Sequence, residues 1–288
     1  MKRKILVLVI ISISFVFSYR TAQAFNLNVR EGKVRLIIPP GGTKAGSIPL
    51  ENTSDKPIFV TVHMEDWAYI SSSDGSKKFS PAGTLANSCA NWVKFSPAKL
   101  SIPPYGKGMV SYMVNVPQDA TGGYYSVLFF ESIMSNAAND QGVNVDVALS
   151  IGTLFYVEPQ GTIRREVALR NLTLEKNAEK SSFNLSLEME NTGNIDATAS
   201  GTFHIMDKKG MVYTRGEFNK VYTLPGDKAQ LLSEWKEALS KGIYDLILTI
   251  DIGKALEEAK LGRGPIIVKE AKIEVGPSGE ILQVGEMK

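Results

Sequence analysis

Apolar and polar residues alternate in short runs along most of the chain, and clusters of turn residues separate these runs. Residues 143–151 are the most regular example. Their apolar positions are Val143, Val145, Val147, Leu149 and Ile151. Residues 110–116 and 183–189 show the same period of two, whereas residues 124–130 are almost continuously apolar. Alternation is typical of half-buried strands, and a continuous apolar run is typical of a strand buried on both faces. The pattern predicts an all-β sandwich rather than an α/β fold.

The second half of the chain repeats features of the first. An Asn-Thr turn cluster occurs at residues 51–55 and again at residues 190–194. Asn closes such turns through its own side chain, so we expect a structural role for both clusters. Tyr125 (or Tyr124) and Tyr244 each follow a glycine at the start of an apolar run, which resembles the tyrosine corner of immunoglobulin-like sandwiches. The chain is therefore predicted to form two tandem immunoglobulin-like β-sandwich domains.

The predicted domain boundary lies at residues 158–162, where Pro159 ends a strand and Gly161 restarts the chain. It divides the chain into a first domain at 25–159 and a second at 160–288. Because no long linker separates them, we expect a fixed angle with a cleft between them. Two segments have a mixed pattern: we expect a strand and then a turn at 231–239, and one or two helical turns at 255–261.

Residues 1–24 have the features of a secretory signal peptide. Lys2, Arg3 and Lys4 precede an apolar run at residues 5–16, and an A-x-A pattern ends at Ala24. The alternative is a membrane anchor, but the run is shorter than the ~20 apolar residues that a span needs. We therefore expect export, cleavage after Ala24 and no membrane span in the product.

The charge of the chain changes with this cleavage. The precursor has 32 basic and 30 acidic residues, and the signal peptide holds four of the basic ones and none of the acidic ones. The product then has a net charge of −2, so the basic precursor gives no reason to expect nucleic acid as a partner.

Residue counts argue against an enzyme. The chain has one cysteine and two histidines, and it carries none of the common hydrolase, metal or nucleotide motifs. No cofactor or metal is expected. Glu65 and Asp66 are adjacent on a strand and would point to opposite faces, which predicts a solvated strand end rather than a pair of catalytic carboxylates. Cys89 is expected to be a small buried residue, because neither histidine has a protease context.

The first domain resembles the N-terminal domain of periplasmic pilus-assembly chaperones, the partners of outer-membrane ushers. Four segments carry the resemblance: 34–38, 48–60, the turn into a strand at 95–106, and the strand at 124–131 followed by the closing strand that ends in Leu-Phe-Tyr-Val-Glu-Pro at 154–159. The resemblance covers about residues 27–159. Within the second domain only the sandwich and its Asn-Thr-Gly turn match.

The resemblance implies a non-enzymatic periplasmic chaperone that lends an edge strand to fimbrial-type subunits, with an outer-membrane usher as a further candidate partner. The matching strand holds the alternating residues Val143 to Ile151. This is strand addition, in which main-chain hydrogen bonds give affinity and alternate side chains fill pockets. The alternative for this strand is that the same face packs into the domain's own core.

The family also holds the subunit's terminal carboxylate with an arginine on the first strand and a lysine before the closing strand. Arg35 matches the arginine, and an ordinary ion-pairing role is its alternative. No lysine stands at residues 150–153. Arg164 or Arg165 is a candidate replacement. The missing lysine keeps a second function open: a non-enzymatic envelope protein, built on the same tandem sandwich, that serves in adhesion or binds the cell wall.

Overall fold

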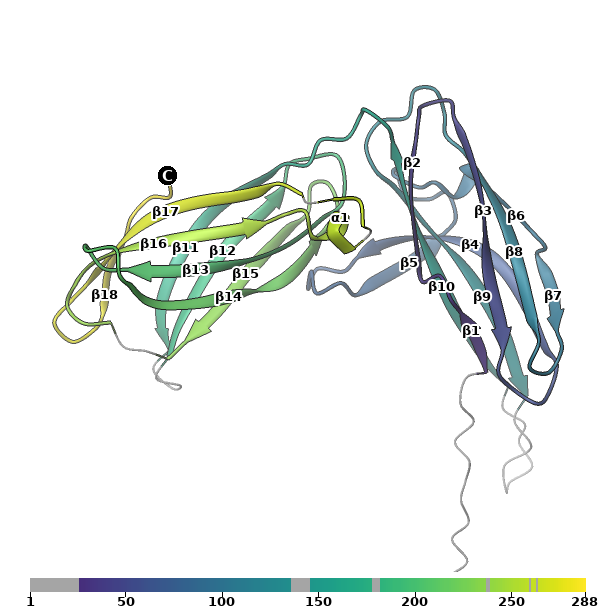
Figure 1. Ribbon diagram of the computed structural model, residues 1–288, viewed down its shortest axis with the longest axis horizontal. Coiled ribbons are helices and arrows are strands. Elements are labelled where there is room, and N and C mark those ends of the chain that lie inside the picture. The colour runs from purple at the N-terminus through teal and green to yellow at the C-terminus, as the bar shows by residue number, and fades with distance from the viewer. Residues whose placement is uncertain (1–25, 136–145, 178–181, 237–238, 259, 263) are drawn as a thin grey trace, which may run out of the picture.

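The computed structural model describes residues 26–288 except 136–145, 178–181, 237–238, 259 and 263. The predicted signal peptide lies outside the described residues. Within them the chain folds into two β-sandwiches of immunoglobulin-like type, which confirms the predicted all-β class. Figure 1 shows the sandwiches as two arms of a bent molecule.

The first sandwich consists of two sheets. One has the strand order β1 (Leu27–Val29), β3 (Thr43–Asn52), β8 (Lys107–Asn115) and β6 (Val93–Ser96). The other has the order β2 (Lys33–Ile38), β10 (Asp146–Pro159), β9 (Tyr124–Ser135), β4 (Ile58–Tyr69) and β5 (Lys77–Pro81), and β7 (Lys99–Ile102) pairs with β4. A 3-10 turn at Ala90–Trp92 leads into β6.

The alternation seen in the sequence decides which side chains enter this sandwich. On β8, Val110, Tyr112 and Val114 are buried between the sheets, whereas Met109 and Met113 point outward and are exposed. Burial of alternate side chains on neighbouring strands gives one continuous apolar core. The sequence pattern therefore predicted the inward face of this strand correctly.

The second sandwich has a three-stranded and a five-stranded sheet. The first has the order β11 (Val167–Asn177), β12 (Ser182–Asn191) and β15 (Lys228–Trp235). The second has the order β14 (Val212–Thr223), β13 (Ala197–Met206), β16 (Gly242–Asp251), β17 (Ile266–Val275) and β18 (Ile281–Val284). The helix α1 (Lys254–Glu258) follows β16. The mixed segments thus overlap the strand β15 and this helical turn, as expected, whereas residues 237–238 of the predicted turn lie outside the described residues.

The repeated Asn-Thr turns have matching structures. Asn52 is buried, and its amide donates to the carbonyl oxygens of Lys56, Ile102 and Pro103 at 2.7, 3.1 and 3.0 Å. Asn191 is also buried and donates to the carbonyl oxygen of Ile195 at 2.9 Å. In both turns a backbone N–H two residues further on donates to the Asn side-chain oxygen. The predicted structural role of these clusters is confirmed.

The two sandwiches meet through a buried aromatic cluster. It consists of Trp67, Tyr69, Tyr125, Val127 and Tyr156 from the first sandwich and Leu224 from the second. The Tyr69 ring also lies 5.6 Å from the ring of Tyr222 on β14, and the backbone N–H of Tyr222 donates to the carbonyl oxygen of Ser73 at 2.9 Å. At this contact the expected cleft is filled by side chains.

Candidate functional site

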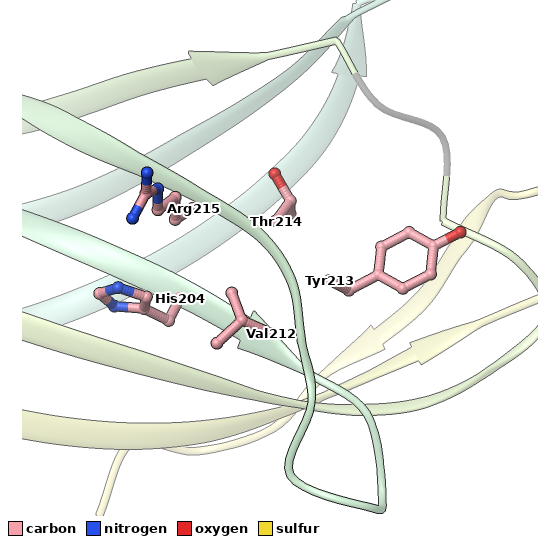
Figure 2. Close-up of a pocket in the computed structure, with 5 residues that line it drawn as sticks. All are labelled: His204, Val212, Tyr213, Thr214 and Arg215. Carbon is pink, nitrogen blue, oxygen red and sulfur yellow. The ribbon is translucent and has the colours of Figure 1, made fainter.

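A surface pocket lies beside the hairpin formed by β13 and β14. Figure 2 shows its lining residues, which are His204, Val212, Tyr213, Thr214 and Arg215. Strands β13 and β14 belong to the second sandwich, so this pocket is separate from the strand that the sequence singled out for binding.

That strand, β10, is paired on both sides for only part of its length. It pairs antiparallel with β9 from Asp146 to Val157. On its other side it pairs with β2, in parallel, from Leu154 to Pro159. The N–H of Leu154 donates to the carbonyl oxygen of Gly32 at 3.0 Å, just before β2 begins. In the described part of the chain, no strand pairs with residues 146–153 on the β2 side; we call this side the open edge.

The side chains along the open edge have two environments. Phe155 and Val157, next to β2, are completely buried in the core of the first sandwich. Leu149 and Ile151 have the same parity on the strand but are only half-buried. The predicted core packing and the predicted docking edge therefore do not exclude each other: the face turns inward, while the backbone beside it stays open.

The other predicted docking residues are described incompletely. Val143 and Val145 lie outside the described residues. Val147 is part of the β10 backbone, but its side chain is among those not described. The docking role of the five apolar residues stays a prediction.

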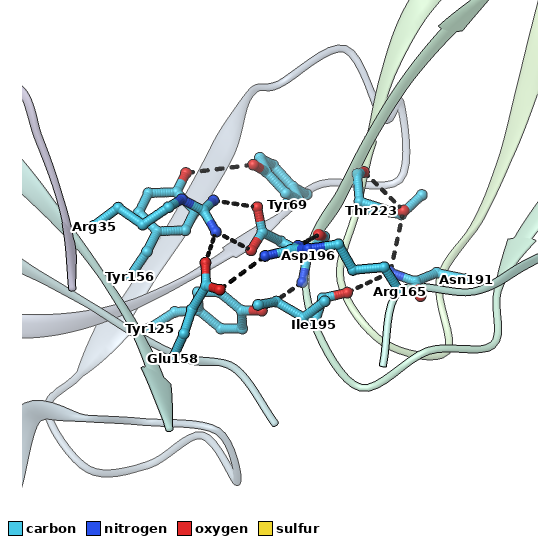
Figure 3. A network of polar contacts seen from close by, with 11 residues as sticks. Arg35, Tyr69, Tyr125, Tyr156, Glu158, Arg165, Asn191, Ile195, Asp196 and Thr223 are labelled. Carbon is cyan, nitrogen blue, oxygen red and sulfur yellow. Dashed lines mark hydrogen bonds and ion pairs between the residues drawn. The ribbon is translucent and has the colours of Figure 1, made fainter. Parts of the chain in front are cut away.

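Arg35 lies in a buried group of charges where the two sandwiches meet (Figure 3). Its guanidinium donates to both carboxylate oxygens of Asp196, with Nη1–Oδ1 and Nη2–Oδ2 distances of 3.1 and 2.6 Å. Nη1 also donates to Glu158 on β10. Arg165 donates from Nη2 to the second oxygen of Glu158 at 2.8 Å. We call these four residues the ion cluster.

The ion cluster joins residues from both sandwiches. Asp196 precedes β13 of the second sandwich, and its backbone N–H donates to the hydroxyl oxygen of Tyr125 on β9 at 2.6 Å. The Tyr156 ring covers the guanidinium of Arg35, whose Cζ lies 4.5 Å from the ring centre. Burial by itself would lower the pKa of Arg35, but the charges and hydrogen bonds of Asp196 and Glu158 outweigh it and raise that pKa above its usual value. The arginine is therefore permanently charged and neutralised from both sides.

The tyrosine hydroxyls of the aromatic cluster, which lies next to the ion cluster, also keep one protonation state. Burial and then the charge of Asp196 raise the pKa of the Tyr125 and Tyr156 hydroxyls above their usual range. Burial likewise raises the pKa of Tyr69, whose hydroxyl lies 3.5 Å from that of Tyr156. These three hydroxyls therefore stay neutral over the ordinary pH range.

The sequence identified part of this cluster. It singled out Arg35 and offered Arg165 as a nearby cation, and the structure brings the two around one carboxylate, that of Glu158. The carboxylate-anchoring role of Arg35 stays a prediction. Arg164 is exposed and pairs with Glu166 at 3.3 Å instead. Glu158 and Asp196 were missed; the available signal for Glu158 was an acid inside the closing strand, whereas Asp196 had none.

The predicted solvated strand end is wrong for Asp66. Its side chain is completely buried. It accepts hydrogen bonds from the backbone N–H groups of Thr84 and Leu85, at 2.8 and 3.0 Å, and from the hydroxyl of Ser126 at 3.2 Å. This carboxylate stabilises the loop that precedes the 3-10 turn, because buried polar groups need hydrogen-bond partners. Glu65 is partly exposed, and its Oε1 lies 3.5 Å from Nε2 of His63.

Cys89 is completely buried, as predicted. Burial raises the pKa of its thiol to about 12. Among the described residues, no three His, Cys, Asp or Glu side chains come close enough together to hold a metal ion. Within the same residues, no helix is long and apolar enough to cross a membrane.

No family model matches the chain, and no curated protein matches it by sequence. Several solved structures of fimbrial chaperones resemble it in architecture. The class 5 fimbriae chaperone CfaA is 9% identical with a TM-score of 0.49, over 85% of this chain and 98% of that chain. The YadV chaperone is 9% identical with a TM-score of 0.43, over 86% and 100%. A chain from the complex of the Salmonella enterica SafA pilin with the SafB chaperone is 13% identical with a TM-score of 0.41, over 85% and 96%. Similarities at this level describe architecture and assign no residue a role.

Proposed function

We propose that this protein is a periplasmic chaperone that binds fimbrial-type subunits by donating β10 to their fold. The open edge at residues 146–153 carries the proposal. Within the part of the chain that the structure describes, the backbone there has a partner strand on one side only, and the apolar side chains of Leu149 and Ile151 are only half-buried. A partner strand added at this edge would pair with the backbone and cover both side chains.

A strand edge of this kind needs a partner strand. An unpaired strand with alternating apolar residues is a template for aggregation unless something covers it. A subunit that lacks one strand of its own sandwich has the complementary defect, so each protein would satisfy the other. The contact between the sandwiches would hold the edge at a fixed angle to the second sandwich.

The location and the further partner follow from the same proposal. Export by the signal peptide at residues 1–24, with cleavage after Ala24, would deliver the protein to the periplasm, where unassembled fibre subunits need protection. An outer-membrane usher would then accept the complex. The protein would act by binding alone, without catalysis.

The test is purification of the exported protein from the periplasm of its native host. We expect a one-to-one complex with a small β-rich subunit, identified by mass spectrometry. Leu149→Asp and Ile151→Asp would each abolish the complex, because a buried carboxylate without a partner is strongly unfavourable.

Ser150→Asp is the matched control, because Ser150 lies between these residues, is exposed and points to the opposite face. It adds the same charge to the same strand and should leave the complex intact. Circular dichroism and thermal unfolding would verify that all three variants fold. Retention of the subunit by folded Leu149→Asp would contradict the proposal, and so would a free monomer that binds peptidoglycan.

A further inference from the structure

We infer that Arg35 serves as an interdomain positioning residue and that a bound segment is recognised without its terminal carboxylate. The inference rests on the proposed function, because it concerns how a strand at the open edge is held. It departs from what the resemblance of the first domain implies for Arg35. The partner is accordingly an extended apolar segment for which a chain end is not required.

The first observation is where the open edge ends. From Leu154 onward β2 occupies the side of β10 on which a partner would pair. The hydroxyl of Thr153 already donates to the carbonyl oxygen of Glu31, and the N–H of Leu154 donates to that of Gly32. Arg35 pairs with Tyr156, three positions beyond Thr153, which is about 10 Å further along a strand. A partner strand would stop at β2 before it reached Arg35.

The second observation is charge balance. The ion cluster contains two cations, Arg35 and Arg165, and two anions, Glu158 and Asp196, so its formal charge is zero. A carboxylate from a partner would be a third anion in this group. If it displaced Asp196 instead, it would leave that buried carboxylate without a salt bridge, which is strongly unfavourable.

The third observation is access. The side chains of Arg35, Glu158 and Asp196 are 3%, 4% and 1% exposed. The Nη atoms of Arg35 are engaged, and its buried Nε has no acceptor among the described residues. The Tyr156 ring covers the guanidinium. A partner could approach Nε only by separating the two sandwiches, so this unpaired donor does not provide an open subsite.

The terminal residue of a partner would instead meet Glu31, Gly32 and Lys33. Glu31 and Gly32 are exposed. The ammonium of Lys33 lies 4.4 Å from the centre of the Tyr156 ring. Because the charges of Glu31 and Lys33 have opposite signs, their net electrostatic interaction with a terminal carboxylate would be small, as it is with a neutral terminal amide. The affinity would then come from the backbone pairing and the apolar side chains.

The experiment compares two forms of one probe. The probe is a fluorescein-labelled peptide of four Val-Thr repeats, which matches the eight residues of the open edge, synthesised as the free acid and as the C-terminal amide. Fluorescence anisotropy with the exported protein at 20 and 150 mM NaCl gives both dissociation constants. We expect them to agree within twofold at both salt concentrations, because the opposite charges of Glu31 and Lys33 offset each other where the terminus would lie.

The outcomes separate the two proposals. Free acid that binds at least fivefold more tightly than amide would overturn this inference and leave the proposed function standing. Failure of both forms to bind, or equal binding by Leu149→Asp, would instead count against the open edge itself. With Asp55→Cys and Lys209→Cys spin-labelled, one on each sandwich, Arg35→Met should broaden the distance distribution between the labels. An unchanged distribution in that variant would overturn the positioning role.

Discussion

Replacing Arg35 with Met tests whether the ion cluster holds the two sandwiches together. The variant keeps an apolar stem against Tyr156 and removes every hydrogen bond that the Arg35 side chain makes. Glu158 would keep Arg165 at 2.8 Å. Asp196, which is 1% exposed, would lose the bidentate pair that neutralises it. The substitution should therefore leave Asp196 without a salt bridge, whereas Glu158 keeps one.

The expected magnitude follows from that difference. Removing one partner of a buried ion pair costs about 3–5 kcal/mol, because the other charge stays buried without compensation. Asp196→Asn should cost less than Arg35→Met, because Arg35 would still pair with Glu158. The double variant Arg35→Met/Asp196→Asn removes both partners of this pair, and Glu158 still pairs with Arg165, so no buried charge is left without a partner. We expect its cost to fall below the sum of the single costs by about 2 kcal/mol, within the range measured for contacting residues.

The assay is denaturant unfolding followed by tryptophan fluorescence, in variants that keep only Trp67 or only Trp235 of the three tryptophans of the chain, because Trp235 is buried in the core of the second sandwich. Trp67 is completely buried in the aromatic cluster, with the rings of Tyr69 and Tyr125 at 5.1 and 5.4 Å. It therefore reports directly on the contact between the sandwiches. We expect Arg35→Met to lower the denaturant midpoint reported by Trp67 fluorescence and to leave the midpoint of the second sandwich unchanged. This result would localise the effect to the contact between the sandwiches.

Arg164→Met is the matched control. Arg164 is 59% exposed and pairs with Glu166 at 3.3 Å on the surface. Loss of an exposed pair costs at most about 1 kcal/mol. The reasoning would be refuted by costs of Arg35→Met and Asp196→Asn that add within about 0.5 kcal/mol in the double variant, the tolerance expected of independent sites. A cost of Arg35→Met no larger than that of Arg164→Met would refute it as well.

Three further predictions concern groups away from the ion cluster. Cys89, with a thiol pKa of about 12, should resist iodoacetamide at pH 8 and react only at the rate of unfolding. Because the pKa of this thiol is higher in the folded than in the unfolded chain, the unfolding free energy should fall as pH rises above about 9, where the thiol of the unfolded chain loses its proton. Asn52→Ala should lower the unfolding free energy of the first sandwich by about 2–3 kcal/mol, since it leaves the buried carbonyl of Ile102 without this donor; an unchanged melting curve would contradict the structural role of that turn. Asn219, whose side-chain oxygen accepts from the N–H of Leu232 at 2.6 Å, covers the edge of β15, so Asn219→Ala should cost about 1 kcal/mol and increase aggregation measured by light scattering.

The strands of the fold could be predicted because their cause is local. Alternation at residues 110–116 requires only that every second side chain meets apolar surface, and any sandwich satisfies it. Both Asn-Thr turns could be predicted as well, because each Asn side chain bonds to a backbone group four residues further on. The additional bonds from Asn52 to the carbonyl oxygens of Ile102 and Pro103 are long-range and could not be predicted. Asp66 shows where this reasoning stops: its burial depends on a loop 18 to 22 residues away.

The candidate site also has one part that the sequence predicted and one part that only the tertiary structure shows. The sequence by itself predicted a strand with an apolar face at residues 143–151, and it drew attention to Arg35. The tertiary structure alone decided that β2 stops pairing at Leu154, which leaves the open edge, and that Arg35 meets Asp196, 161 positions away. A strand's pattern is set by the period of its own backbone. The pairing of an edge and the neutralisation of a buried charge depend on which distant segments share that space, and only the packing of the two sandwiches settles this.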